Sequence, residues 1–173
     1  MRLSAILGTR GEGKTTAAVS LGLRASSAGL MTAGIVAPVV YNEGVRIGYD
    51  VVDLCSGERA PWLRLAEGVP TVGPFIVVHG GETVARGALE RMLSGESDLA
   101  ILDEVGEWEL AGGGHSWAVD RLADCPAASI VLVMREGVVT RVKQRWGFSF
   151  RCWRPCEVQS LASALGLGGE ACR

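Results

Sequence analysis

Short apolar runs alternate with helical patterns along most of the chain. Runs that are apolar on both faces, as expected for buried parallel strands, occupy Leu3–Leu7, Leu99–Leu102 and Ser129–Met134. Apolar positions at helical spacing predict helices over Lys14–Ala28, Glu82–Leu93, Ser116–Ala123, Val138–Trp146 and Val158–Leu165. Because strands and helices alternate, the pattern indicates an α/β fold with a mainly parallel sheet.

Two β-rich runs interrupt this alternation. Met31–Val40 and Val45–Leu54 are separated by the turn-forming segment Tyr41–Gly44, and together they predict an inserted β-hairpin. Phe75–Val78 predicts one more short strand. Since no linker or shift of composition divides the chain, we expect residues 1–173 to form a single domain.

Composition places the chain among ordinary globular proteins. Hydrophobic residues make up 48% and charged residues 21%, which argues against a disordered chain or a coiled coil. The formal net charge of -2 supplies no field that would attract nucleic acid, so we expect none as a partner. The apolar runs fall short of the ~18 residues of a membrane span, and the first residues do not resemble a signal peptide. We therefore expect a cytoplasmic protein that does not enter a membrane.

Glycine is the unusual residue, and its first cluster indicates a phosphate site. The chain holds 24 glycines, about twice the usual share of ~7%. Residues 8–15 read GTRGEGKT, which fits the phosphate-loop pattern G-x-x-x-x-G-K-[ST] between a predicted strand and a predicted helix. Backbone N–H groups of the loop would hold the phosphates, Lys14 would bridge the β- and γ-phosphates, and Thr15 would ligate Mg²⁺. The predicted nucleotide-binding residues are Gly8, Thr9, Arg10, Gly11, Glu12, Gly13, Lys14, Thr15 and Thr16.

A pair of acids follows the second buried run. The sequence LAILDE at 99–104 places Asp103 and Glu104 at the carboxyl end of a predicted central strand, where ligands collect in open parallel sheets. Asp103 would hold Mg²⁺ through water, and Glu104 would turn its carboxylate toward the attacking nucleophile. Because a glutamate in that position can activate water, the pair favours hydrolysis over nucleotide binding alone.

Two arginines and one tryptophan are further candidates. Arg135, directly after a buried run, and Arg46, on the predicted hairpin, could supply the cation that stabilises charge during phosphoryl transfer. Solvated surface charge is the alternative for both. Trp108 lies close in sequence to the acids and could contact the nucleotide base or form a lid, with a half-buried cover as the alternative.

Three sequence blocks resemble one family of enzymes. GTRGEGKTT at 8–16, VRIGYDVVDLCSGERAPWLR at 45–64 and LDEVGEWEL at 102–110 are similar, in this order, to conserved blocks of the thermophile and cancer-related nucleoside-triphosphatase family. The resemblance runs from about Arg2 to about Trp146. It implies that residues 8–16 bind a triphosphate and that Asp103 and Glu104 organise magnesium and water.

The resemblance also implies a fold. It is the three-layer P-loop NTPase fold of the additional-strand, catalytic-glutamate division, with helices on both faces of the sheet and another strand between the first strand and the one that carries Asp103. A rival division of such proteins has a lysine early in the loop, where this chain has Thr9 and Arg10. The chain departs from the family at Trp108, where methionine is usual, and at Gly112–Gly114, which we expect to loosen the segment that follows.

The sequence therefore predicts a magnesium-dependent nucleoside-triphosphatase that hydrolyses a nucleoside triphosphate to the diphosphate and phosphate. ATP, GTP and other triphosphates stay open as the substrate. Two alternatives remain: a small-molecule or nucleoside kinase, whose acceptor pocket would lie at Val45–Leu54, and a nucleotide-dependent accessory protein of cofactor biosynthesis with little turnover. A protein partner is left open, because no residue identifies one.

Overall fold

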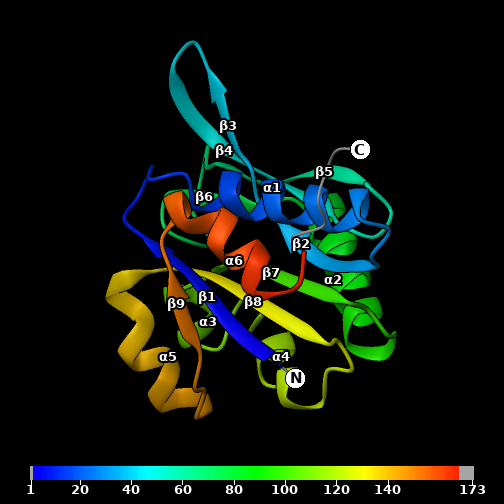
Figure 1. The fold of residues 1–173 in the computed structure, drawn as a ribbon. Helices are drawn as coiled ribbons and strands as arrows, with labels where there is room; N and C mark the ends of the chain where they lie inside the picture. The colour runs from blue at the N-terminus through cyan, green and yellow to red at the C-terminus, as the bar shows by residue number, and fades with distance from the viewer. Residues whose placement is uncertain (1, 168–173) are drawn as a thin grey trace.

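The computed structural model describes residues 2–167 and places one sheet between two layers of helices (Figure 1). The strand order is β6-β5-β4-β2-β7-β8-β1-β9, and β3 pairs with β4 outside this path. The strands are β1 (Arg2–Gly8), β2 (Thr32–Val36), β3 (Val39–Asn42), β4 (Val45–Asp53), β5 (Arg59–Leu65), β6 (Phe75–Val77), β7 (Leu99–Val105), β8 (Ser129–Arg135) and β9 (Arg151–Trp153).

The middle of the sheet is parallel and buried on both faces. Strands β2, β7, β8, β1 and the edge strand β9 pair in parallel, and the side chains of β2, β7, β8 and β1 alternate between the two helical layers. Ala5 and Leu7 of β1 thus belong to one core cluster and Ile6 to the other. Strand β8 lies between β1 and β7, which confirms the additional strand expected between the first strand and the one that carries Asp103.

Helices cover both faces of the sheet, as expected for three layers. Helices α1 (Lys14–Ser27) and α6 (Val158–Ala164) pack on one face, where Leu21 and Leu161 are fully buried. The other face is covered by α2 (His79–Ser94), α3 (Glu107–Leu110), α4 (Ser116–Val119) and α5 (Val139–Trp146). Between residues 2 and 167, no helix combines the length and the apolar character needed to cross a membrane.

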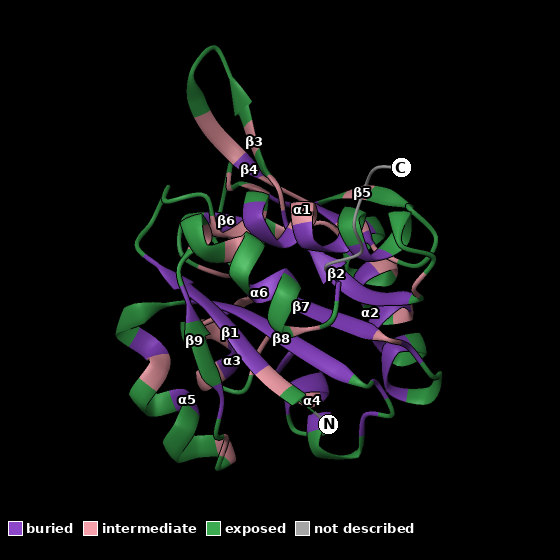
Figure 2. Ribbon diagram, in the orientation of Figure 1, coloured by how far each residue is buried: buried purple, intermediate pink, exposed green. Residues whose placement is uncertain are grey.

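The predicted hairpin is present, but its first run is two strands. The run Met31–Val40 breaks at Ala37 and Pro38 into β2 and β3, because proline has no N–H to donate within a sheet. Strands β3 and β4 form the hairpin, with Glu43 and Gly44 in the left-handed region at its turn. Strand β4 also pairs with β2 and β5, so the hairpin is joined to the main sheet while its outer end projects from the body and is exposed (Figures 1 and 2).

Several short elements were not expected from the sequence. Strand β5 contains Pro61, which pairs with Asp50 beside an irregularity in β4 where a ladder hydrogen bond can be omitted. Strand β9 and helix α3 are too short to show a period. The helix predicted over Ser116–Ala123 is instead the short helix α4 followed by the 3₁₀ turn η1 (Leu122–Asp124).

Candidate functional site

A cavity of about 720 Å³ lies at the carboxyl ends of the central strands, where open parallel sheets bind their ligands. It brings together the phosphate loop after β1, the acid pair of β7 and both candidate arginines. The sequence-predicted residues that line it are Gly8, Thr9, Arg10, Lys14, Arg46, Asp103, Glu104, Trp108 and Arg135. The predicted loop residues outside this lining are Gly11, Glu12, Gly13, Thr15 and Thr16; Thr16 is exposed.

The loop between β1 and α1 has the curled backbone that phosphate binding requires. The backbone φ angles of Gly11 and Gly13 are 79° and 82°, in the left-handed region where a residue with a side chain would be strained. Gly13 is the residue before the first turn of α1, so the positive end of that helix faces the loop. The ammonium group of Lys14 donates to the carbonyl oxygen of Thr9 at 2.6 Å and lies across the loop.

Glu12 places a negative charge within the same loop. Its Oε2 accepts a hydrogen bond from the backbone N–H of Thr9 at 2.6 Å and one from the Thr9 hydroxyl at 3.1 Å. These hydrogen bonds, the backbone one first, lower the pKa of Glu12. The carboxylate is therefore ionised at neutral pH and sits beside the groups that would hold phosphate.

Thr15 and Asp103 lie near one another across the two halves of the site. The buried Asp103 carboxylate accepts hydrogen bonds from the N–H of Ala37 at 3.0 Å and the N–H of Glu104 at 2.8 Å, and the nearby Thr15 side chain acts to lower its pKa. Burial, followed by the charge of Glu104, raises the pKa of Asp103 to about 7. Ala37 comes from the end of β2, so the ends of two strands hold this carboxylate.

The donor set at this point fits magnesium. Mg²⁺ prefers oxygen ligands and usually takes one or two carboxylates together with phosphate oxygens and water. Asp103 and Thr15 offer a carboxylate and a hydroxyl near one another, beside the loop that would carry the phosphates. These two residues would hold the ion.

Glu104 is presented by an unusual backbone at the end of β7. Its φ of 60 is left-handed, which is uncommon for a residue with a side chain, and the pairing with β8 is irregular between Leu102 and Val105. Burial raises the pKa of Glu104, while Arg135, Lys14 and Arg46 lower it in part. The three cations predicted to take part in the chemistry therefore lie within electrostatic reach of this carboxylate.

Trp108 lines the cavity and packs closely against Trp62 and the segment of Gly113 and Gly114. Its ring stacks on Trp62 with 6.2 Å between the centroids. A Cβ at Gly113 would lie 2.1 Å from Trp108 Nε1, and one at Gly114 would lie 2.2 Å from Glu109 Oε1. The expectation that this glycine run loosens the chain is wrong, because the glycines allow close packing against Trp108 and Glu109.

The aromatic side chains beside Arg46 were not predicted from the sequence to belong to the site. The Arg46 guanidinium donates to the Tyr49 hydroxyl at 3.1 Å and lies 5.1 Å from the centroid of the Phe75 ring. Tyr49 and Phe75 meet edge to face at 5.6 Å. Nothing in the local sequence joins these residues, because β6 follows a long irregular segment.

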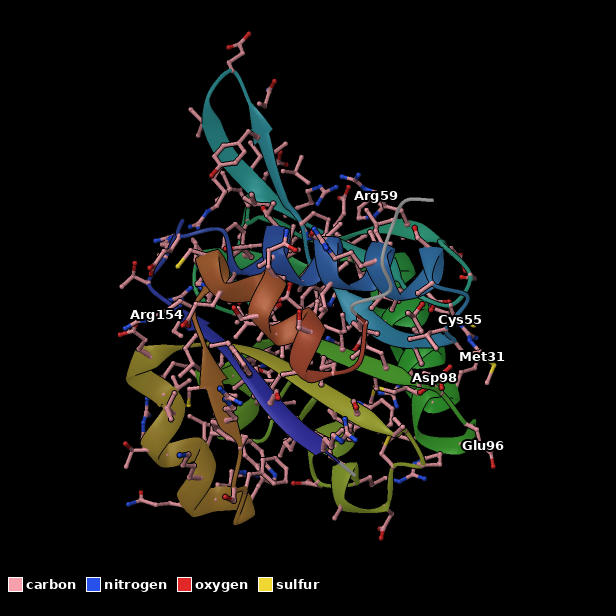
Figure 3. The ribbon with its side chains drawn as sticks, viewed as in Figure 1. Met31, Cys55, Arg59, Glu96, Asp98 and Arg154 are labelled. Atoms are coloured by element: carbon pink, nitrogen blue, oxygen red, sulfur yellow. The ribbon has the colours of Figure 1, made fainter. Side chains whose placement is uncertain are left out.

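Arg154 is a further cation that sequence reasoning missed. It follows β9, forms an ion pair with Glu136 and lowers the pKa of Glu12 through its charge. Figure 3 shows it at the side of the molecule where the phosphate loop lies, away from Asp98 and Glu96 at the other ends of the strands. The sequence signal for Arg154 was a basic residue directly after β9, and a strand of three residues is too short to be predicted.

The chain is similar to proteins that are known as nucleoside-triphosphatases. A family model described as NTPase matches residues 4–152. The chain is 39% identical to nucleoside-triphosphatase THEP1 of Pyrobaculum aerophilum over 60% of its own length, and it spans 57% of that relative. It is 32% identical to nucleoside-triphosphatase THEP1 of Methanothermobacter thermautotrophicus, over 81% of this chain and 80% of the relative. A solved structure of a human cancer-related nucleoside triphosphatase superposes with a TM-score of 0.72 at 23% identity, covering 98% of this chain and 100% of that one.

Proposed function

Because this chain belongs to the NTPase family, we propose that it is a magnesium-dependent nucleoside-triphosphatase that transfers the γ-phosphoryl group of its substrate to water. The single observation that carries the proposal is the meeting of the phosphate loop with the acid pair at one cavity, which Gly8, Lys14 and Asp103 all line. The names of the relatives support the same activity.

Residues of the loop would bind the triphosphate. The backbone N–H groups from Gly11 to Thr15 and the positive end of α1 would face the β- and γ-phosphates. Lys14 would leave the Thr9 carbonyl and bridge the same two phosphates. Thr15 and Asp103 would hold Mg²⁺, which neutralises phosphate charge when bound.

Glu104 would orient water for attack on the γ-phosphorus. The water oxygen forms the new bond, the bond to the bridging oxygen breaks, the diphosphate leaves with that electron pair, and the proton passes toward Glu104. Arg135 and Arg46 would stabilise the charge that spreads over the phosphoryl oxygens. The contact of Trp108 with the base stays a prediction.

Phosphate release tests this proposal. We expect release from ATP, GTP or CTP with Mg²⁺ and none with EDTA. Glu104→Gln should lower the rate about 10²–10⁴-fold, the usual contribution of a positioned general base, while the nucleotide still binds. Glu96→Gln is the matched control, because Glu96 is exposed at the opposite ends of the strands (Figure 3).

Two outcomes would contradict the proposal. Unchanged release by Glu104→Gln would remove Glu104 from the chemistry. Nucleotide binding without release by the unmodified chain would indicate the accessory role, in which binding itself is the output.

A further inference from the structure

The cavity extends past the acid pair into a region with ring-lined walls. We call this region the aromatic chamber and define it by Tyr49, Trp62, Leu63, Val72, Phe75 and Trp108. Trp62, Leu63 and Phe75 are buried, and the other three side chains are half-buried. A mostly apolar, aromatic wall with one arginine at its edge is typical of a site for a planar ring.

The order of strands places Glu104 between the phosphate loop and the aromatic chamber. The loop follows β1, Arg135 ends β8, and Glu104 lies near the end of β7. Four chamber residues lie farther along the sheet: Tyr49 is on β4, Trp62 and Leu63 are on β5, and Phe75 is on β6. Val72 precedes β6, and Trp108 lies on α3 and borders the acid pair. The loop and the aromatic chamber are thus on opposite sides of the carboxylate that would orient the nucleophile.

In-line phosphoryl transfer gives this order a chemical meaning. The attacking and leaving oxygens lie on opposite faces of the γ-phosphorus, so the leaving diphosphate cannot share the face that Glu104 serves. The nucleoside would then extend from the loop toward β9, where the charge of Arg154 acts on Glu12. The aromatic chamber is left on the side from which the nucleophile comes.

Water alone does not account for a chamber of this kind. The cavity of about 720 Å³ includes the phosphate loop and the acid pair as well as the aromatic chamber, so it is the chemistry of the chamber walls that points to a second ligand. Aromatic and aliphatic walls offer water few hydrogen bonds, although they bind a ring through its faces. Arg46 is held over Tyr49 and Phe75 and also acts on Glu104, so it stands where a bound ring and the reacting groups would meet.

We propose that the aromatic chamber binds a second substrate, a planar heteroaromatic compound that carries a hydroxyl group, as a nucleoside does. The chain then transfers the γ-phosphoryl group to that hydroxyl as well as to water. The hydroxyl oxygen bonds to the γ-phosphorus, the bond to the bridging oxygen breaks, the nucleoside diphosphate leaves with the electron pair, and the proton goes to Glu104. This inference rests on the proposed function, because the same loop and acids supply the phosphoryl group.

The test measures ADP and free phosphate separately during turnover of Mg·ATP. The probes are adenosine, guanosine, cytidine, uridine and pyridoxine, each at about 1 mM, a concentration that detects weak binding. Hydrolysis alone gives an ADP-to-phosphate ratio of one. We expect at least one probe to raise the ratio about twofold or more and to appear as its phosphate ester in a mass spectrum.

Two tryptophan substitutions locate the second substrate. Val72→Trp fills the aromatic chamber and should return the ratio to one. Val69→Trp is the matched control in the same segment, because Val69 is 91% exposed, and it should keep the raised ratio. The thermal midpoint of each variant shows whether it is folded, and Tyr49→Leu is the second chamber variant if Val72→Trp is not.

The same variants separate an acceptor from the base of the triphosphate itself. A nucleobase in the aromatic chamber would make Val72→Trp bind AMP-PNP about tenfold more weakly with no change for inorganic triphosphate, and that result overturns the inference. A ratio of one with every probe also overturns it while phosphate release upholds the proposed function. ADP formed only with a probe supports the inference and contradicts hydrolysis.

Discussion

The side chain of Thr15, in the first turn of α1, lies near the carboxylate of Asp103 on β7 and acts to lower its pKa against the effect of burial. The phosphate loop and the acid pair are therefore held in one frame rather than brought together by a ligand. Asp103 is fixed further by the N–H groups of Ala37 and Glu104. A site built in this way supplies the preorganised charge that phosphoryl transfer needs.

Chemical labelling of lysine distinguishes the loop from the surface. The chain has two lysines, Lys14 in the loop and Lys143 on α5, where its ammonium group lies 4.8 Å from the Phe150 ring centroid. Because Lys14 would bridge the phosphates, Mg·AMP-PNP should lower its rate of acylation about tenfold or more. Peptide mapping reads both sites, and Lys143 is the internal control. Equal protection of the two lysines, or of neither, would place the nucleotide elsewhere.

Glu12→Gln should tighten nucleotide binding. The substitution removes a negative charge that lies beside the phosphate-binding N–H groups and leaves a side chain of similar shape. We expect the Kd of Mg·AMP-PNP to fall about threefold at low salt and the difference to shrink at 1 M salt, since exposed charges are screened. Titration calorimetry measures both, with Glu96→Gln as control. Weaker binding by Glu12→Gln would instead give the carboxylate a direct role in holding the loop for the ligand.

The His115 side chain should contribute a loss of stability in acid, opposite in sign to the contribution of Asp103, whose pKa is raised. The His115 ring is buried and stacks on Trp62 at 4.8 Å, its Nε2 has no hydrogen-bond partner among the described residues, and burial with Arg86 lowers its pKa to about 4. Between pH 6.5 and 4 the unfolded chain binds a proton at His115 that the folded chain does not bind. The contribution of His115 to the free energy of unfolding therefore falls as pH falls. The full loss is on the order of 3 kcal/mol.

Urea unfolding from pH 7.5 to 4 checks this. His115→Phe keeps a stacked ring without a titrating group, so it should gain stability relative to the unmodified chain as the pH falls from 7.5 to 4. His79→Gln, at the start of α2, is the control and should follow the unmodified chain. Parallel pH curves for His115→Phe and the unmodified chain would show that His115 does not carry the dependence.

Gly113→Ala should displace Trp108. The added methyl group would lie 2.1 Å from the indole nitrogen, so the ring or the backbone must move. We expect a loss of about 1–3 kcal/mol in the free energy of unfolding, as for other overpacked sites, and a changed tryptophan emission spectrum. Gly68→Ala meets no atom within 4 Å and should be nearly neutral. An unchanged stability for Gly113→Ala would mean that this packing is loose.

The catalytic half of the site could be predicted from the sequence because its chemistry restricts the residue types. A phosphate loop needs glycines at Gly11 and Gly13, and a magnesium site needs an acid at the end of a neighbouring strand, as Asp103 is. These requirements are local, so they are readable from short segments. The parallel core was predictable for the same reason, since its strands are continuous apolar runs.

The aromatic chamber could not be predicted, because it depends on pairing between distant segments. Strand β5 brings Trp62 to the site. Pro61 argues against a strand in the sequence, and it is accommodated only because it pairs with an irregular position of β4. Phe75 joins the site only because β6 pairs with β5. Arg154 likewise reaches the loop through the pairing of β9 with β1. Which of these strands pair, and in which register, cannot be predicted from any one segment alone.

The central claim is that the loop and the acid pair act on one magnesium-bound triphosphate, and the Kd of AMP-PNP with Mg²⁺ and with EDTA tests it most directly. We predict that Mg²⁺ tightens binding about tenfold or more in the unmodified chain and in Lys143→Ala. Asp103→Asn should abolish that gain, and Lys14→Ala should weaken binding in both conditions. Binding that ignores Mg²⁺ in the unmodified chain, or that both substitutions leave intact, would contradict the account.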